Sequence, residues 1–212
     1  MTCMNAYDIL SVIALLRDRL DPPERAANLS DTLAGEYPLA RKAAVLLGLF
    51  EQDGQIFLPF IRRSSTLRLH SGQIAFPGGA ADPTDQSLVE TALREAREEI
   101  GLDPSGVKAL GVLRPMFTVV SNFLVVPVVA YLPRGLGQVQ LQMGEVDELF
   151  PLPLAGLSDP ANFHSEIWTR DGQPRTVYFY DVAGYRVWGV TAYILHTFLA
   201  ILDSDTHLSY FP

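Results

Sequence analysis

Three glutamates stand on one short segment with helical character, Arg94–Leu102 (Arg-Glu-Ala-Arg-Glu-Glu-Ile-Gly-Leu). Glu95, Glu98 and Glu99 have the spacing i, i+3 and i+4, so on a helix they project from one face. Like charges this close repel one another and weaken an isolated helix. A divalent cation would remove that repulsion, because hard Mg²⁺ and Mn²⁺ bind carboxylate oxygens. The segment therefore predicts a metal site formed by the three glutamates.

The neighbouring residues predict how this segment is positioned. The spacing indicates a helix from about Ser87 to Ile100, and Gly101 is a typical C-terminal stop. The stripe opposite the glutamates is apolar and consists of Val89, Leu93, Ala96 and Ile100. A solvated acidic face is the alternative interpretation. The order of a glycine pair, a loop, the acidic helix and a glycine stop favours the metal site.

The same stretch resembles the Nudix box, G-x5-E-x7-R-E-U-x-E-E-x-G-U, in which U is apolar. The match is complete over Arg94–Leu102. In the first half, strict counting puts Ala80 at the glycine position and Gln86 at the first glutamate position. A loop one residue longer restores Gly79 as the glycine and places Asp85 six residues after it. We interpret this departure as a variant loop, because the helical half carries the metal chemistry.

A second stretch lies upstream and reads R-S-x3-R-x3-G-x3-F-P-G-G. Its members are Arg63-Ser64, Arg68, Gly72 and Phe76–Gly79. It is similar to the stretch that precedes the Nudix box in the coenzyme A pyrophosphatase branch, as are Asp82–Asp85, Thr91–Leu93 and Trp188–Ala192. The resemblance implies metal-dependent hydrolysis of the diphosphate linkage of coenzyme A or its derivatives. Water would attack phosphorus, and the products would be 4′-phosphopantetheine and adenosine 3′,5′-bisphosphate.

The implied substrate needs cations beyond the metal, because coenzyme A carries a diphosphate and a separate 3′-phosphate. Arg63 and Arg68 are the candidates, since guanidinium groups grip phosphate in a bidentate manner. Gly78 and Gly79 lack a Cβ, so their backbone can bend tightly or approach a phosphate. The alternative interpretation for the two arginines is a solvated loop charge. The alternative for the two glycines is an ordinary turn residue.

Metal binding and proton transfer need further roles among these residues. The box glutamates are the implied ligands of Mg²⁺ or Mn²⁺, and Arg94, i−4 from Glu98, is expected to orient a carboxylate. The attacking water must lose a proton to a box glutamate or to an acid from another loop. Glu145 is the catalytic candidate from the later acidic turn, with Asp147 and Glu148 as further candidates and a solvated role as the alternative for each.

Other functions remain open at this point. The first alternative is a Nudix hydrolase of another nucleoside diphosphate derivative, such as ADP-ribose or a dinucleotide. The upstream stretch argues against it. A catalytically inactive nucleotide sensor is another; the intact glutamates oppose it, whereas Ala80 and Gln86 keep it open. Several aromatic residues are candidates for stacking on adenine, with core packing as the alternative. They are Tyr178, Phe179, Tyr180, Tyr185 and Trp188.

Composition limits the class of protein. The chain has 212 residues, 48% of them hydrophobic and 19% charged, and a net charge of −8. This favours a globular protein over a nucleic-acid or membrane-surface binder. We see neither a secretory leader nor an apolar run of the roughly 20 residues that span a bilayer. One cysteine, Cys3, fits a reducing compartment, so we expect a cytoplasmic enzyme of small molecules.

The pattern along the chain predicts a mixed α/β protein. The expected elements are a helix at Tyr7–Leu20, a hairpin of Ala43–Phe50 and Ile56–Ile61, strands at Val107–Leu113 and Phe123–Leu132, a continuation of the sheet at Val139–Leu141, a proline-rich corner after Glu145–Phe150, a hairpin of Phe163–Thr169 and Val177–Val182, and a helix at Val187–Leu202. The Nudix resemblance implies an α/β/α sandwich with a mixed sheet. We expect one Nudix domain over residues 1–212, with its core at about 41–203. Residues 1 to about 40 form an N-terminal helical extension that serves as a dimer arm, a lid or a packed flank, and a homodimer is left open.

Overall fold

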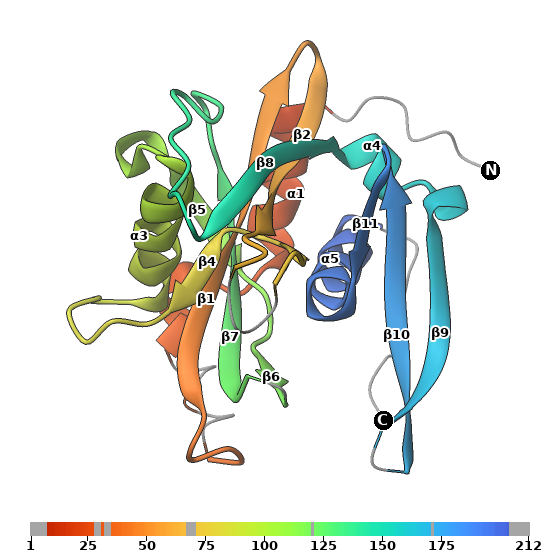
Figure 1. Cartoon of the computed structure of the whole chain (residues 1–212). Helices are drawn as coiled ribbons and strands as arrows, with labels where there is room; N and C mark the ends of the chain where they lie inside the picture. Colours follow the sequence, from red (N-terminus) through yellow and green to blue (C-terminus); the bar gives the residue numbers. More distant parts are fainter. Residues whose placement is uncertain are drawn as a thin grey trace.

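The computed structural model describes residues 8–27, 31, 35–66, 71–119, 121–170 and 172–203. Helices lie on both sides of a large sheet, and a smaller sheet flanks one of the helices (Figure 1). The elements are α1 (Ile9–Arg19), β1 (Arg41–Gln52), β2 (Gln55–Arg63), β3 (Ile74–Ala75), β4 (Gly78–Ala80), α3 (Leu88–Ile100), β5 (Lys108–Val112), β6 (Met116–Thr118), β7 (Phe123–Tyr131), β8 (Val146–Pro153), α4 (Leu154–Leu157), β9 (Phe163–Arg170), β10 (Gln173–Val182), β11 (Tyr185–Trp188) and α5 (Gly189–Leu202).

The large sheet is mixed. Its main order is β3-β2-β1-β7-β5, and β4, β6 and β8 pair with β1, β7 and β2 respectively. β1 and β7 run parallel, whereas the other pairs are antiparallel. The apolar run of β7 lies between β1 and β5, as its continuous hydrophobicity predicts for a strand that is covered on both faces.

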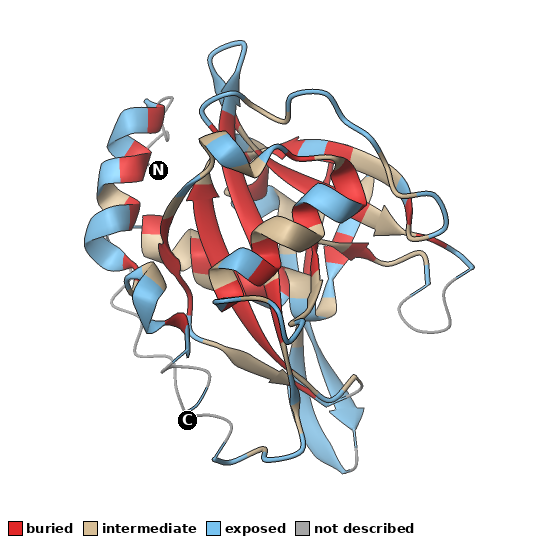
Figure 2. Ribbon diagram, turned by 90° about the vertical axis from the view of Figure 1, so that its left-hand side faces the viewer, coloured by how far each residue is buried: buried red, intermediate tan, exposed pale blue. Residues whose placement is uncertain are grey.

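Alternating residues of β1 and β7 form two hydrophobic cores, one on each face of the sheet. Leu46, Val126 and Val128 belong to the core beneath α3. Leu47 and Val129 belong to the core on the other face, with residues of α1 and α5. Figure 2 shows these strands buried between helices whose outer surfaces are exposed. The predicted α/β/α sandwich with a mixed sheet is confirmed.

A three-stranded sheet in the order β11-β10-β9 packs beside α5. β9 and β10 form a long hairpin (Figure 1). Most of β9 is exposed, whereas Phe179, Tyr180 and Val182 on β10 are buried. α1, the described helix of the N-terminal segment, packs against β5 and α5. No helix in the described part of the chain is both long and apolar enough to cross a membrane.

Most of the predicted elements are present, with three corrections. Val139–Leu141 is not a strand; the N–H of Gln140 instead donates to the Ile100 carbonyl, and so satisfies the C-terminal end of α3. The expected corner after Phe150 is part of β8, which continues to Pro153. Proline is tolerated there because, among the described strands, β8 pairs with β2 alone and has a free edge. The last helix begins at Gly189, since Tyr185–Trp188 form β11.

Candidate active site

A glycine pair in β4 lies directly against the acidic helix. Gly78 pairs with Val45 of β1, and its N–H donates a hydrogen bond to Glu99 Oε2 at 2.9 Å. The backbone of Gly78 has φ +152°, and a Cβ there would lie 2.3 Å from the Ala44 carbonyl oxygen. Only glycine fits this approach. The predicted contact of this pair with phosphate stays a prediction, because the structure shows the glycines making room for the protein's own groups.

Glu99 is a buried carboxylate with two hydrogen-bond donors. It is 1% exposed, and besides the Gly78 N–H it faces Arg63, whose Nη1 lies 3.4 Å from Oε1. Burial raises the pKa of Glu99 to about 7, although both donors oppose the shift; the negative charges of Glu95 and Glu145 raise it further. A site of this kind favours an added positive charge.

Glu95 lies one turn earlier on α3 and packs on the second glycine. A Cβ at Gly79 would lie 2.6 Å from the Glu95 carboxylate, so the absence of a side chain there leaves room for it. Arg94 Nη1 donates to Glu95 Oε1 at 2.9 Å. The pKa of Glu95 is raised, chiefly by burial and against the effect of Arg94. Gly78 thus binds Glu99 through its N–H, and Gly79 leaves room for Glu95.

Arg94 connects the helix to the loop that precedes it. Its Nε and Nη2 donate to the two carboxylate oxygens of Asp85 at 2.9 and 3.0 Å, and Nη2 also donates to the Ala80 carbonyl at 2.9 Å. Nη1 donates to Glu95 and, at 3.1 Å, to Glu98. Arg94 therefore holds two of the three glutamates in place, which is the contact expected of it.

Asp85 is absent from the predicted set of site residues. Its carboxylate is 4% exposed, and the hydrogen bonds from Arg94 are the main cause that lowers its pKa to about 2. Thr91 Oγ1 also donates to it at 2.8 Å. Gln86, at the strict glutamate position, is exposed, and its backbone N–H donates to Glu90. The spacing of six residues from Gly79 is the sequence signal that identifies Asp85.

Glu98 completes the acidic face at its solvent side. Its side chain is 47% exposed and contacts Arg94. Within the residues that the structure describes, no three Asp, Glu, His or Cys side chains already surround a common point. The donor set still suits a hard divalent cation, because Glu95, Glu98 and Glu99 share a helix face and two of them are desolvated.

The later acidic turn contributes one carboxylate to this region. The turn that carries Glu145 lies against α3, since the Gln142 N–H donates to the Glu99 carbonyl at 3.0 Å, and the charge of Glu145 raises the pKa of both Glu95 and Glu99. Asp147 accepts a hydrogen bond from a backbone N–H of the loop after β2, at 3.0 Å. Glu148 accepts hydrogen bonds from the side chains of Arg62, on β2, and Tyr185, on β11. Of the three candidates, Glu145 is the one that the structure brings to the box glutamates.

The upstream stretch reaches the site through Arg63. This side chain is 26% exposed at the end of β2, beside Glu99. Gly72 stabilises the same region, since its N–H donates to the Arg63 carbonyl at 3.0 Å and its φ of +68° makes the turn. Arg68 lies outside the described residues.

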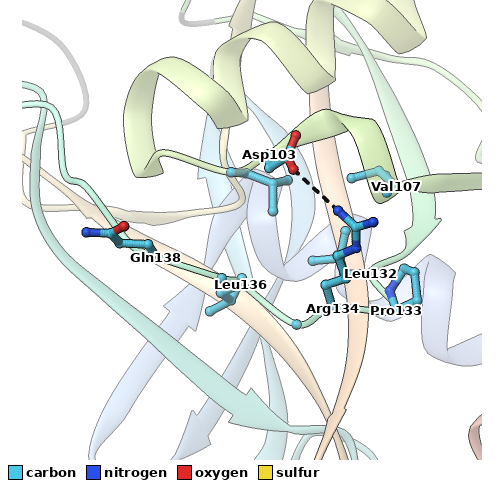
Figure 3. Close-up of a pocket in the computed structure, with 11 residues that line it drawn as sticks. Asp103, Val107, Leu132, Pro133, Arg134, Leu136 and Gln138 are labelled. Atoms are coloured by element: carbon cyan, nitrogen blue, oxygen red, sulfur yellow. Dashed lines mark ion pairs between the residues drawn. The ribbon is translucent and has the colours of Figure 1, made fainter.

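A separate hollow lies beyond the C-terminal end of α3. It has a volume of about 190 Å³ and is lined largely by carbon, with the ion pair of Arg134 and Asp103 at 3.7 Å on one wall (Figure 3). None of the predicted site residues lines it. The chemistry of the acidic helix therefore lies elsewhere.

The fold and the site define an α/β/α sandwich with an arginine-organised acidic helix packed on a glycine pair. The family profile described as the NUDIX domain matches residues 39–171. The chain belongs to the Nudix family. It is 42% identical to the uncharacterized Nudix hydrolase NudL of Photorhabdus laumondii over 156 residues, which are 74% of this chain and 82% of that protein.

Two further comparisons agree with this membership. The chain is 38% identical to NudL of Klebsiella pneumoniae strain 342 over 192 residues, covering 91% of this chain and 92% of the relative. A crystal structure of an Ap4A hydrolase from C. elegans in a binary complex is similar with a TM-score of 0.50. That likeness has 20% identity, covers 76% of this chain and 97% of the other, and shows the fold alone.

Proposed function

We propose that this Nudix hydrolase cleaves the diphosphate linkage of coenzyme A or a coenzyme A derivative, using Mg²⁺ or Mn²⁺. The observation that carries the proposal is the contact of Arg63 with Glu99, 3.4 Å apart. It brings the upstream R-S-x3-R-x3-G stretch, which resembles the coenzyme A pyrophosphatase branch, to the acidic helix. The products would be 4′-phosphopantetheine and adenosine 3′,5′-bisphosphate.

The carboxylates of α3 fit a divalent cation. Glu99 is buried and Glu95 is half-buried, and burial raises the pKa of both, so a nearby cation would stabilise their ionised forms. Glu95, Glu98 and Glu99 would hold Mg²⁺ or Mn²⁺, which when bound supplies positive charge to the diphosphate oxygens. Arg94 keeps Glu95 and Glu98 on the same side of the helix through one Nη1.

The remaining residues of the site would bind and orient the substrate. Arg63 can share its guanidinium between Glu99 and a phosphate, because its five N–H groups form a planar fork. A water that attacks one phosphorus breaks the bond to the bridging oxygen, and its proton must be accepted. We assign that acceptor to Glu145, which lies near Glu95 and Glu99 but on a different segment; a box glutamate is the alternative.

The test of substrate is product analysis by chromatography. Coenzyme A, ADP-ribose and a dinucleotide are incubated with the protein, each with and without Mg²⁺ or Mn²⁺. We expect metal-dependent release of adenosine 3′,5′-bisphosphate from coenzyme A, faster than cleavage of the other two. Cleavage of the other nucleotides alone would refute the coenzyme A assignment. Binding of nucleotide without any cleavage would instead indicate a sensor.

The test of the site uses two glutamates of the same helix. Glu98→Gln removes a proposed metal ligand, whereas Glu90→Gln makes the same charge change near the helix N-terminus, where the side chain accepts a hydrogen bond from the Gln86 N–H. We expect metal-dependent turnover to fall by about 100-fold or more in Glu98→Gln and to persist in Glu90→Gln. Unchanged turnover in Glu98→Gln would show that the site is assigned wrongly.

The proton acceptor is tested separately by Glu145→Gln. If Glu145 accepts the proton, turnover falls by about 100-fold while the metal concentration for half-maximal activity stays the same. A shift of that metal concentration without loss of turnover at saturation would make Glu145 a metal ligand instead.

A further inference from the structure

A second cavity has a volume of about 480 Å³ and is lined in part by Arg62, the neighbour in sequence of Arg63, which contacts Glu99. One wall is formed by Arg62 and by Ser71–Ile74, the segment that leads into β3. The other wall is formed by Gly184–Arg186 and Trp188, on β11 and the turn before it. Its volume falls in the range of about 300–1,000 Å³ that is usual for small-molecule sites. The cavity therefore lies at the junction of the two sheets.

Ring packing and hydrogen bonds join the walls of this cavity to the rest of the protein. Tyr185 stacks on Phe150 with ring centroids 3.7 Å apart, and its hydroxyl donates to Glu148 at 2.7 Å. Thr191 Oγ1 donates to the Ile74 carbonyl at 3.0 Å, which ties the start of α5 to β3. A ligand in the cavity would meet a preformed surface, so little entropy would be lost in ordering the protein.

Two arginines, Arg62 and Arg186, line the cavity, one from each wall. Arg62 donates through Nε to Glu148 at 3.0 Å, and within the described residues its Nη groups form no hydrogen bond. Arg186 donates to Asp181 through Nε and Nη2 at 2.7 and 3.1 Å. Each carboxylate occupies only part of a fork of five N–H groups. Both arginines can therefore hold a phosphate while they keep their present partners.

An aromatic surface completes the cavity. The Trp188 indole is 36% exposed and lies against two aromatic rings. Its centroid is 6.4 Å from that of Phe179, with planes within 8°, and 5.8 Å from that of Trp168, with planes at 45°. A supported and exposed indole offers a face on which a nucleobase can stack. An aromatic face can bind a base, and two guanidinium groups can bind a phosphate, so together they suit a nucleotide.

The cavity is adjacent to the acidic site. The pairing of β2 with β8 is irregular between Arg62 and Arg63, and the two arginines make different contacts. Arg62 lines the cavity and binds Glu148, whereas Arg63 contacts Glu99. Ile74 of the cavity wall precedes Gly78 by four residues, which span at most about 14 Å. β3 between them is the edge strand of the sheet, so an extended ligand can cross it. A diphosphate at the glutamates and a nucleoside in the cavity are within the reach of one molecule.

We infer that this cavity is the subsite for the nucleoside end of the substrate, where Trp188 stacks on the base and Arg62 and Arg186 bind the phosphate outside the diphosphate. The inference rests on the proposed function. It predicts that the enzyme prefers nucleotides with an added phosphate on the ribose over those without one. Coenzyme A has such a phosphate, whereas ADP-ribose and simple dinucleotides do not.

Binding to the cavity can be followed through Trp188 itself. The chain has two tryptophans, and they lie against each other with ring centroids 5.8 Å apart, so Trp168→Phe leaves Trp188 as the sole indole and keeps an aromatic ring beside it. In this background, with a chelator present, the protein is titrated with adenosine 3′,5′-bisphosphate and with AMP. We expect both to quench the Trp188 fluorescence, and the bisphosphate to bind about tenfold more tightly, as one charge-assisted phosphate contact provides. Binding measured by calorimetry without any change at Trp188 would overturn the assignment.

Two variants separate the base from the phosphate. Arg186→Met should bring the affinities for the two nucleotides to within about threefold, because it removes one of the phosphate contacts. Trp188→Leu, followed by calorimetry, should weaken both equally, because both share the base. Arg17→Met, which removes the same charge from the exposed side of α1, is the matched control and should change neither. Unchanged affinities in Arg186→Met and Trp188→Leu would refute the subsite.

Kinetics distinguish failure of the subsite from failure of the proposed function. For coenzyme A, Arg186→Met should raise KM about tenfold at unchanged kcat, while KM for coenzyme A without its 3′-phosphate stays the same. Cleavage of coenzyme A with equal KM in wild type and variant would reject the subsite and keep the function. Selective quenching of Trp188 without cleavage of coenzyme A would keep the subsite and reject the function.

Discussion

At the scale of single residues, the site depends on how Arg94 is held. Its guanidinium donates to both carboxylate oxygens of Asp85, and from this position it also donates to Glu95 and Glu98. The same contacts lower the pKa of Asp85 from 3.8 to about 2. A carboxylate with a lowered pKa stabilises the folded state when it is ionised. Asp85 therefore links the geometry of the glutamates to the pH dependence of stability.

Asp85→Asn should reveal this link. Because the folded pKa lies below the unfolded value of 3.8, the contribution of Asp85 is fully present above about pH 4 and is lost as the pH falls through about 2. We expect the free energy of unfolding at pH 5 to be higher for the wild type than for Asp85→Asn. This difference should shrink by about 2 kcal/mol toward pH 2. Denaturant unfolding of both proteins across this range measures it; an advantage that does not change with pH would contradict it.

The two glycines of β4 differ in what a methyl group would meet. At Gly79 it would meet the Glu95 carboxylate, the end of a side chain that can turn away, whereas at Gly78 it would meet backbone atoms of Ala44 and Val45. We expect Gly79→Ala to retain stability within about 1 kcal/mol. Its turnover should nevertheless fall by up to about 100-fold, as displacement of a catalytic group by 1 Å can cause.

Gly78→Ala is the matched contrast. It should destabilise the fold by about 3 kcal/mol or more, because a Cβ 2.3 Å from a carbonyl oxygen forces two strands apart at a φ of +152°. Thermal unfolding and turnover of the two variants, measured side by side, check both expectations. The assignment of Glu95 fails if Gly79→Ala is fully active.

At the scale of elements, α3 is defined by its ends as much as by its apolar face. Ser87 Oγ accepts the N–H of Glu90 at the N-terminus, and Gly101 ends the helix with φ +74°. A Cβ at Gly101 would lie 2.8 Å from the backbone nitrogen of Gln140, whose N–H satisfies the Ile100 carbonyl. The segment after β7 therefore closes the helix that carries the glutamates.

Gly101→Ala tests this closure against Gly54→Ala. Both glycines have positive φ, near +74° and +72°, but a Cβ at Gly54 meets nothing within 4 Å. The left-handed backbone alone costs about 1–2 kcal/mol in each variant. We expect Gly101→Ala to lose a further 1 kcal/mol or so, because Gln140 must move. Equal losses by chemical denaturation would show that the contact with Gln140 contributes nothing.

The sequence predicts an element well where its pattern determines its environment. β7 is a continuous apolar run and lies in the middle of the sheet, and Ser87, Glu90 and Gly101 bound α3 where their types indicate. β8 is less predictable, because Pro151 is permitted only by its place at a free edge, which depends on tertiary structure.

The candidate site divides in the same way. The helical glutamates follow from local spacing, whereas the contact of Arg63 with Glu99 joins the end of β2 to α3, residues 36 positions apart. The contact of Asp85 with Arg94 depends on the conformation of a loop whose sequence departs from the strict Nudix box. Glu145 is brought near the helix by a turn whose course no local pattern specifies. Contacts between distant segments were thus the part of the site that the sequence could not supply.

At the scale of the whole molecule, α3 covers one face of the central sheet, and α1 and α5 cover the other. The buried side of α3 packs in the same core as β1 and β7, through residues such as Ala92 and Ala96. Loss of α3 would expose that whole face to water, so the helix cannot separate from the sheet without loss of the core. A ligand that stabilises α3 in place should therefore stabilise the fold as a unit.

This coupling makes metal binding measurable without any substrate. The charges of Glu95, Glu99 and Glu145 oppose one another in the folded protein, and a cation bound among them removes a repulsion that the unfolded chain does not have. Binding to the folded state alone raises the free energy of unfolding, by about 2.7 kcal/mol when the metal is at 100 times its Kd.

We expect Mn²⁺ to raise the unfolding midpoint of the wild type in a concentration-dependent manner, whereas Glu95→Gln should lose most of this gain. Glu90→Gln, with the same charge change outside the acidic face, should keep it. Since the stabilisation arises only if the cation contacts this face, an equal gain in all three proteins would place the metal elsewhere.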